Sequence, residues 1–170
     1  QDILKEKENG GFDAVFVAIG AHLAKKVNIP AQEASKILDA VSFLKEADEN
    51  SDNKPLLGRR VAIYGGGNTA MDAARTAKRL GADEAMIIYR RDREHMPAHE
   101  FEADEALSEG VKIHWLSTIK NMETSSITVE KMQVVNGKAV PTGEYETLEA
   151  DSLILALGQE ADTDFLKHIE

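Results

Sequence analysis

The sequence of 170 residues predicts an α/β fold, with helices on one face of a parallel sheet and an antiparallel β-meander on the other. Two apolar runs, residues 61–63 and 85–89, flank a glycine turn and a segment with helical apolar spacing, which is typical of a parallel βαβ unit. From residue 111 the pattern changes to short alternating strands. We expect residues 1–170 to form a single domain.

The glycine turn fits the fingerprint G-x-G-x-x-G/A as Gly65-x-Gly67-x-x-Ala70, which indicates a Rossmann-like dinucleotide cradle. Gly65 allows a tight turn, Gly67 leaves the backbone open to a pyrophosphate, and Ala70 lets the helix lie close to the sheet. Free N–H groups at the helix start would meet the phosphates. We therefore predict cofactor-binding residues Gly65, Gly66, Gly67, Asn68, Thr69 and Ala70; the alternative is a glycine-rich turn that binds nothing.

The residues after the second strand bear on which dinucleotide would bind. Arg90 and Arg91 come first, followed by Asp92 and Arg93. Arginine pairs with a 2′-phosphate through charge-assisted contacts, so Arg90 and Arg91 favour NADP(H). In the alternative interpretation the arginines are a solvated run and Asp92 bonds the ribose of NAD.

The first third of the chain is expected to contain three elements. Residues 2–9 read as a short polar helix, and residues 13–20 as a fully buried strand that ends in Ala-Ile-Gly. An extended connection through Pro30 then leads to an amphipathic helix over residues 34–47. The polar segment that follows is predicted to be a solvated loop.

The helix after the fingerprint is expected to end at Gly81, and another is expected to begin near Pro97 and to end at Gly110. His95 and His99 are four residues apart, as in some metal sites. Pro97 lies between them and no third ligand is evident, so we favour a loop beside the cofactor and predict no metal.

The last third of the chain predicts short strands. The apolar phase slips between Val129 and Met132, which indicates a bulge, and Asn136-Gly137 indicates a two-residue hairpin. A third piece near residues 145–148 would complete the meander. A buried strand over residues 151–159 then ends in Ala-Leu-Gly, an echo of residues 18–20.

Composition excludes several classes of protein. The net charge of −10 argues against a nucleic-acid or membrane binder, although residues 59–93 carry eight Lys/Arg and only four Asp/Glu. With no cysteine, these residues can form neither a disulfide nor a cysteine-ligated cluster. We expect a soluble protein of the cytoplasm, and, because the sequence opens on Gln1, a piece of a longer protein.

Several motifs together resemble a known family. Gly65-Gly66-Gly67-Asn68-Thr69-Ala70-Met71-Asp72, Tyr89-Arg90-Arg91, Met96-Pro97-Ala98 and Ala156-Leu157-Gly158-Gln159 look like the small (beta) subunit of NADPH-dependent glutamate synthase and its homologues. The order of elements is similar to the NAD(P)H-binding domain of flavoproteins with two dinucleotide-binding domains, in the pyridine nucleotide-disulphide oxidoreductase superfamily.

The resemblance implies electron transfer from NADPH to FAD and onward through iron–sulfur clusters to a partner subunit. It implies that Gly158 and Gln159 also contact the cofactors, and that the FAD-binding domain of the same full-length chain is a partner. FAD and the clusters would bind mainly outside these residues, so we expect this chain to be inactive alone, with no catalytic residue of its own.

Two other functions stay open at this point. A stand-alone NADP-dependent dehydrogenase would need a general acid near the nicotinamide, and no Tyr-x-x-x-Lys or comparable set is present. A Rossmann module used for subunit assembly would bind no coenzyme at all.

Overall fold

The computed structural model describes residues 5, 9–21, 23–25, 28–31, 36–48 and 55–164. Internal contacts divide the chain into two compact units, Ala24–Gln159 and a smaller one made of Gln1–Leu23 and Glu160–Glu170. A single domain over residues 1–170 stays a prediction. No helix among the described residues is long and apolar enough to cross a membrane; the expected cytoplasmic location stays a prediction.

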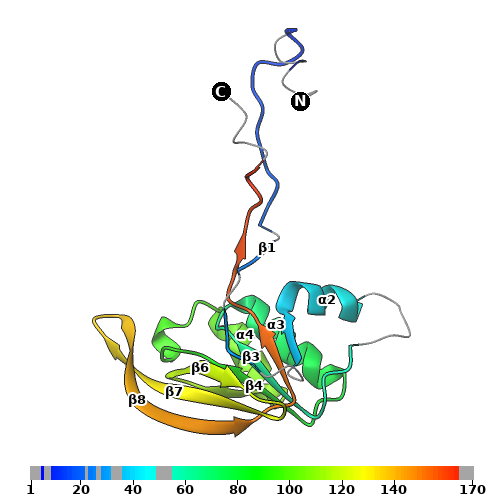
Figure 1. The fold of residues 1–170 in the computed structure, drawn as a ribbon. Helices are drawn as coiled ribbons and strands as arrows, with labels where there is room; N and C mark the ends of the chain where they lie inside the picture. The colour runs from blue at the N-terminus through cyan, green and yellow to red at the C-terminus, as the bar shows by residue number, and fades with distance from the viewer. Residues whose placement is uncertain are drawn as a thin grey trace. The chain divides into compact units, whose positions relative to one another are not determined.

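The larger unit is built on a five-stranded sheet in the order β2-β9-β3-β4-β5, in which every paired neighbour is parallel. Its three central strands, β9, β3 and β4, are short and mainly apolar, as is typical of parallel sheets covered on both faces. The glycine turn connects β3 to helix α3 (Asn68–Arg79), and Figure 1 shows this helix beside the sheet. The strands are β2 (Lys36–Asp39), β3 (Arg60–Tyr64), β4 (Glu84–Ile88), β5 (Lys112–His114) and β9 (Ser152–Leu155).

Helices cover one face of this sheet. They are α2 (Ala40–Asp48), α3 (Asn68–Arg79) and α4 (Glu100–Ser108), with a 3₁₀ turn η1 (Arg93–His95) before α4. Alternation along the strands sends Val61 and Ile63 to this face, where they pack against fully buried alanines of α3. Gly81, with φ of +98°, follows the last turn of α3 as predicted.

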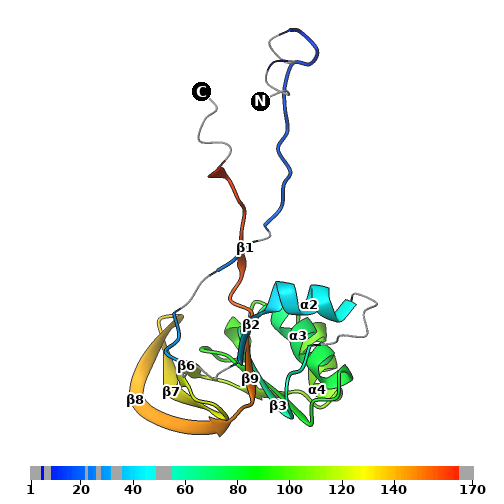
Figure 2. The same cartoon turned by 45° about the vertical axis from the view of Figure 1, so that its right-hand side comes forward.

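An antiparallel sheet covers the other face (Figure 2). Its strands are β6 (Ser117–Met122), β7 (Ser126–Val135) and β8 (Lys138–Glu149), in that order. The β7–β8 register shifts between Glu130 and Met132, which confirms the predicted bulge. Asn136 and Gly137 have φ of 52° and 74°, as a tight hairpin requires. The predicted fold class is thereby confirmed.

One predicted helix begins too early. Residues 34–35 lie outside the described part, but Lys36–Asp39 form strand β2 rather than the start of a helix over residues 34–47. Ile37 and Leu38 pack on opposite faces of the sheet, which a strand permits. Asp39 accepts hydrogen bonds from the backbone N–H groups of Val41 (3.0 Å) and Ser42 (3.1 Å), so its side chain caps the helix where it begins.

The predicted buried strand over residues 13–20 is also wrong. In the smaller unit these residues form no strand, and the side chain of Phe16 is 92% exposed. A strand buried on both faces needs neighbouring strands, and the described residues give this segment none. Of the polar helix expected over residues 2–9, only Lys5 and Asn9 lie inside the described part; the Lys5 carbonyl accepts from Asn9 N–H at 3.0 Å. Strands β1 (Leu23–Ala24) and β10 (Gln159–Glu160) form a separate two-stranded sheet.

A charge cluster joins α3 to α4. Arg75, whose side chain is 17% exposed, contacts Glu109 at 2.7 Å, Glu105 at 2.9 Å and Glu102 at 3.7 Å. Hydrogen bonds from Arg75 and, to a smaller extent, from Arg79 lower the pKa of Glu109. One guanidinium thus holds together three carboxylates that would otherwise repel one another.

Replacing Arg75 with alanine is expected to lower Tm by a few degrees at pH 7, because Glu102 and Glu105 then lose the cation that they share with Glu109, and only Arg79 still pairs with Glu109. The pKa of Glu109 is lowered in the folded state, so its contribution is present above the ordinary glutamate value of 4.5 and is lost as pH falls through the lowered value. The difference in Tm between wild type and Arg75→Ala should therefore shrink as pH is lowered from 7 toward 3. A difference independent of pH would contradict this account.

Candidate dinucleotide-binding site

The glycine turn lies at the carboxyl edge of the sheet, between the ends of β3, β4 and β9. Gly65 has a φ of +155°, and a Cβ there would lie 2.3 Å from the carbonyl oxygen of Ala156 after β9. Its N–H donates to the carbonyl of Ile88 at 3.2 Å. Gly65 thus allows the chain to turn where three strands converge, and no side chain fits.

Gly66 and Gly67 differ in what surrounds them. A Cβ on Gly66 would lie 2.3 Å from Cδ2 of Tyr89, so this glycine makes room for a tyrosine ring. A Cβ on Gly67 would meet nothing within 4 Å. Gly67 has φ of −93° and ψ of 177°, which any residue adopts, so neither strain nor crowding within the described structure requires a glycine here.

The open space at Gly67 adjoins the start of α3. Gly67 occupies the N-cap position, and no side chain caps the helix there. The Gly67 carbonyl accepts from Ala70 N–H at 2.9 Å and Met71 N–H at 3.3 Å, whereas the N–H groups of Asn68 and Thr69 have no partner among the described residues. An uncapped helix start with free donors and open space beside it can hold an anion.

The other predicted residues of the turn contribute to packing. The Oδ1 of Asn68 accepts from the backbone N–H of His99 at 3.1 Å, which ties the start of α3 to the start of α4. Thr69 is half-buried in the first turn, and Ala70 is fully buried against the sheet. The Gly66 carbonyl accepts from Ala98 N–H at 3.0 Å, so the segment before α4 also supports the turn.

The arginines after β4 fall into two groups. Arg93 is ion-paired with Asp104 of α4 at 2.5 Å. Arg90 is exposed, and Arg91 donates from Nε to the hydroxyl of Tyr89 at 3.1 Å. Among the described residues, no carboxylate pairs with Arg90 or Arg91, so both guanidinium groups can bind an anion.

Asp92 is engaged within its own loop. Its Oδ1 lies 2.6 Å from Nδ1 of His95 and accepts from the His95 backbone N–H at 3.1 Å. The contact with His95 holds the pKa of Asp92 below its usual range. Asp92 caps η1, and its contacted oxygen is thus already bonded to protein. The alternative interpretation, with Asp92 as a ribose ligand, would require this cap to open.

His95 and His99 have separate partners. His95 contacts Asp92, whereas the ring of His99 stacks on Phe101 with centroids 5.7 Å apart. The two imidazole rings therefore contact different neighbours. The described residues contain no cluster of three His, Asp or Glu side chains that could hold a metal ion.

Gly158 and Gln159 follow β9, the strand beside β3. Gly158 has φ of +100°, and its carbonyl accepts from the backbone N–H of Lys25 at 3.1 Å. Gln159 is exposed in β10. Ala156, two residues before Gly158, lies against Gly65. Gly158 and Gln159 therefore come shortly after the residue that contacts the glycine turn.

Sequence reasoning missed Tyr89. The structure places its ring against Gly66 and an edge of Trp115, with ring centroids 6.3 Å apart. Its hydroxyl donates to the carbonyl of His95 at 2.6 Å and accepts from Arg91. A signal was available, because a tyrosine that ends a buried strand needs a polar partner for its hydroxyl.

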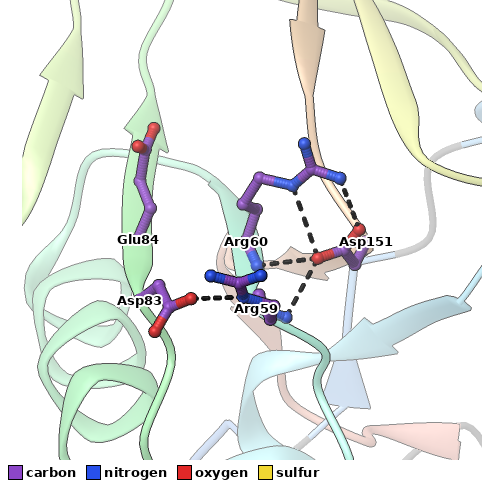
Figure 3. A pocket seen from close by; sticks show the side chains of 5 residues that line it. All are labelled: Arg59, Arg60, Asp83, Glu84 and Asp151. Atoms are coloured by element: carbon purple, nitrogen blue, oxygen red, sulfur yellow. Dashed lines mark hydrogen bonds and ion pairs between the residues drawn. The ribbon is translucent and has the colours of Figure 1, made fainter.

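A polar pocket lies at the opposite, amino edge of the sheet (Figure 3). Its charges pair with each other: Arg59 with Asp83 at 2.5 Å, and Arg60 with Asp151 at 2.9 Å. Asp151 also accepts from the backbone N–H groups of both arginines, and hydrogen bonds to Asp151 and Glu149 raise the pKa of Arg60. Ligands of open α/β sheets bind at the carboxyl edge, so we interpret this cluster as a link between β3 and β9.

The architecture and the turn place the protein in the Rossmann-like α/β class, with a β-meander on the second face of the sheet. The chain belongs to the pyridine nucleotide-disulphide oxidoreductase family, whose sequence profile matches residues 1–170. The family is one of redox enzymes, and the predicted resemblance is confirmed.

Relatives with similar sequences agree with this assignment. The chain is 36% identical to the NADP(+)-dependent formate dehydrogenase subunit beta of Moorella thermoacetica, over 97% of this chain and 25% of the relative. It is 32% identical to the NADPH-Fe(3+) oxidoreductase subunit beta of Geobacter sulfurreducens, over 98% of this chain and 27% of the relative. It is also 32% identical to the glutamate synthase [NADPH] small chain of Azospirillum brasilense, over 88% of this chain and 35% of the relative.

Among solved structures, Mycobacterium tuberculosis FprA in complex with NADPH superposes with a TM-score of 0.68 at 19% identity, over 93% of this chain and 51% of that one. This likeness shows the fold. The chain spans about a quarter of the length of the first two relatives.

Proposed function

We propose that this chain binds NADPH and passes its hydride to FAD in a larger flavin-dependent oxidoreductase. The observation that carries the proposal is the open space at Gly67 beside the uncapped start of α3. A pyrophosphate there would accept from the N–H groups of Asn68 and Thr69. Arg90 and Arg91, at the end of the next strand, would pair with the 2′-phosphate.

The residues present fit the coenzyme at each of these points. The turn offers free backbone donors, the space is open, and the two arginines lack carboxylate partners in the described structure. NADPH supplies the hydride when bound, and the chain's part is to hold and orient it. We further propose that Gly158 and Gln159 contact the cofactors, as the family resemblance implies.

The partners belong to the wider proposal. The relatives include subunits named for NADPH-dependent reduction of Fe(3+) and for glutamate synthase. By analogy, we propose that the FAD-binding domain of the same full-length chain takes the hydride, and that iron–sulfur clusters outside these residues pass electrons to a large subunit, as in glutamate synthase. The final acceptor would be selected there.

Titration of the purified 170-residue chain tests the proposal. We expect binding of NADPH by isothermal titration calorimetry, no flavin absorbance, and no oxidation of NADPH in the presence of an artificial electron acceptor. We expect no bound flavin and no turnover because these residues contain a single glycine fingerprint, whereas a flavoprotein that binds two dinucleotides needs two such fingerprints.

The other outcomes separate the alternatives. A chain that binds no NADPH would support a module used for assembly. A chain that oxidises NADPH by itself would support a stand-alone dehydrogenase. Adding the FAD-binding domain of the full-length protein should restore turnover if the proposal is correct.

A further inference from the structure

Tyr89 connects the glycine turn to the arginine loop. Its side chain is 5% exposed, and its ring fills the space that the missing Cβ of Gly66 leaves. Its hydroxyl makes two hydrogen bonds, one donated to the His95 carbonyl at 2.6 Å and one accepted from Arg91 Nε at 3.1 Å. A hydroxyl can do both at once.

The contact fixes the direction of the Arg91 side chain. The guanidinium carbon of Arg91 lies 5.9 Å from the centre of the Tyr89 ring, and Nε is bonded to the hydroxyl. The Arg91 backbone is held separately, since its carbonyl accepts from Leu116 N–H at 3.2 Å. The two terminal nitrogens of Arg91 have no carboxylate partner among the described residues, which leaves a planar pair of donors for an anion.

We propose that Tyr89 is a positioning residue for coenzyme choice, because its hydroxyl directs the Arg91 guanidinium toward the 2′-phosphate of NADPH. The inference rests on the function proposed above. Tyr89 itself contacts neither the phosphate nor the reacting atoms. Holding the long arginine side chain in advance reduces the rotamer entropy lost when the phosphate binds.

Removing the hydroxyl should therefore affect NADPH and spare NADH. Tyr89→Phe keeps the ring against Gly66 and Trp115 and deletes only the hydroxyl. We expect the affinity for NADPH to fall about three- to tenfold, which is the range for one net hydrogen bond. The affinity for NADH, which has no 2′-phosphate, should stay unchanged.

Tyr64→Phe is the matched control. Tyr64 ends β3, and its hydroxyl is hydrogen-bonded to Oγ1 of Thr118 on β6 at 2.5 Å. The variant removes one tyrosine hydroxyl away from the arginine loop, so both affinities should stay as in wild type. Thermal melts of both variants show whether the fold is kept.

A double-mutant cycle with Arg91→Ala isolates the coupling. In the Arg91→Ala background, Tyr89→Phe should cause no further loss of NADPH affinity, because the side chain it directs is absent. Arg91→Lys examines the same contact from the other partner, since lysine keeps the charge but has no Nε–H to hold; NADPH affinity should again fall while NADH affinity is retained.

The results separate this inference from the proposed function. If wild type prefers NADPH but Tyr89→Phe weakens NADPH and NADH equally, or still weakens NADPH in the Arg91→Ala background, the positioning role is overturned and the proposed function stands. If wild type does not bind NADPH, both are overturned. If wild type binds NADPH and NADH equally, the positioning role fails while coenzyme binding stands.

Discussion

Replacing Gly67 with aspartate is expected to abolish NADPH binding and to leave the free energy of unfolding unchanged or slightly higher. The N-cap position accepts aspartate as readily as glycine, with a difference of a few tenths of a kcal/mol. A Cβ there meets nothing within 4 Å, and the backbone is in an ordinary extended conformation. The carboxylate would accept from the free N–H groups of α3 and would repel the pyrophosphate that we place there.

The loss of affinity should exceed about a hundredfold, because the substitution removes both the space and the donors used by two phosphates. Calorimetric titration with NADPH measures it, and urea unfolding measures stability. An unchanged affinity for NADPH would remove the fingerprint from the proposed site.

Gly65→Ala is the contrasting variant two positions earlier. Its Cβ would lie 2.3 Å from a backbone carbonyl oxygen, and φ is +155°. We therefore expect a loss of stability of about 1–3 kcal/mol or failure to fold. The two substitutions within one motif should thus have different effects, because Gly65 is required for folding and Gly67 is required for binding.

Replacing both Arg90 and Arg91 with alanine is expected to weaken NADPH binding by about ten- to a hundredfold and to change NADH binding little. Each guanidinium has no carboxylate partner among the described residues and can pair with the 2′-phosphate. The two losses need not add, because both arginines can share one phosphate. Titration with both coenzymes measures the change in their ratio.

Salt and a third arginine supply the controls. Raising ionic strength should reduce the wild-type preference for NADPH, since Arg90 is exposed, and should scarcely affect the double variant. Arg93→Ala should leave the ratio near the wild-type value, because Arg93 is already paired with Asp104. Equal wild-type affinities for NADH and NADPH at low salt would contradict the arginine assignment and would favour Asp92 as a ribose ligand.

Much of the larger unit could be predicted because its signals are local. Apolar runs and the spacing of alanines identify β3, α3 and β4, and Asn136-Gly137 identifies the hairpin, since each depends on neighbouring residues alone. The failures involve burial. Residues 13–20 have the composition of a core strand but are exposed, and Lys36–Asp39 form a strand where the periodicity predicted a helix. A short apolar run does not specify which surfaces will cover it.

The sequence by itself determined the position of the glycine turn, Arg90 and Arg91 as candidate phosphate ligands, and the family resemblance. The tertiary structure decided the separate roles of similar residues. Gly65 has no room for a side chain because the carbonyl of Ala156, which follows β9 about 90 residues later in the chain, lies beside it, whereas the space beside Gly67 is open. Arg91 donates a hydrogen bond to the hydroxyl of Tyr89, whereas Arg93 pairs with an aspartate of α4. Contacts of this kind depend on packing between distant segments, and no local pattern records them.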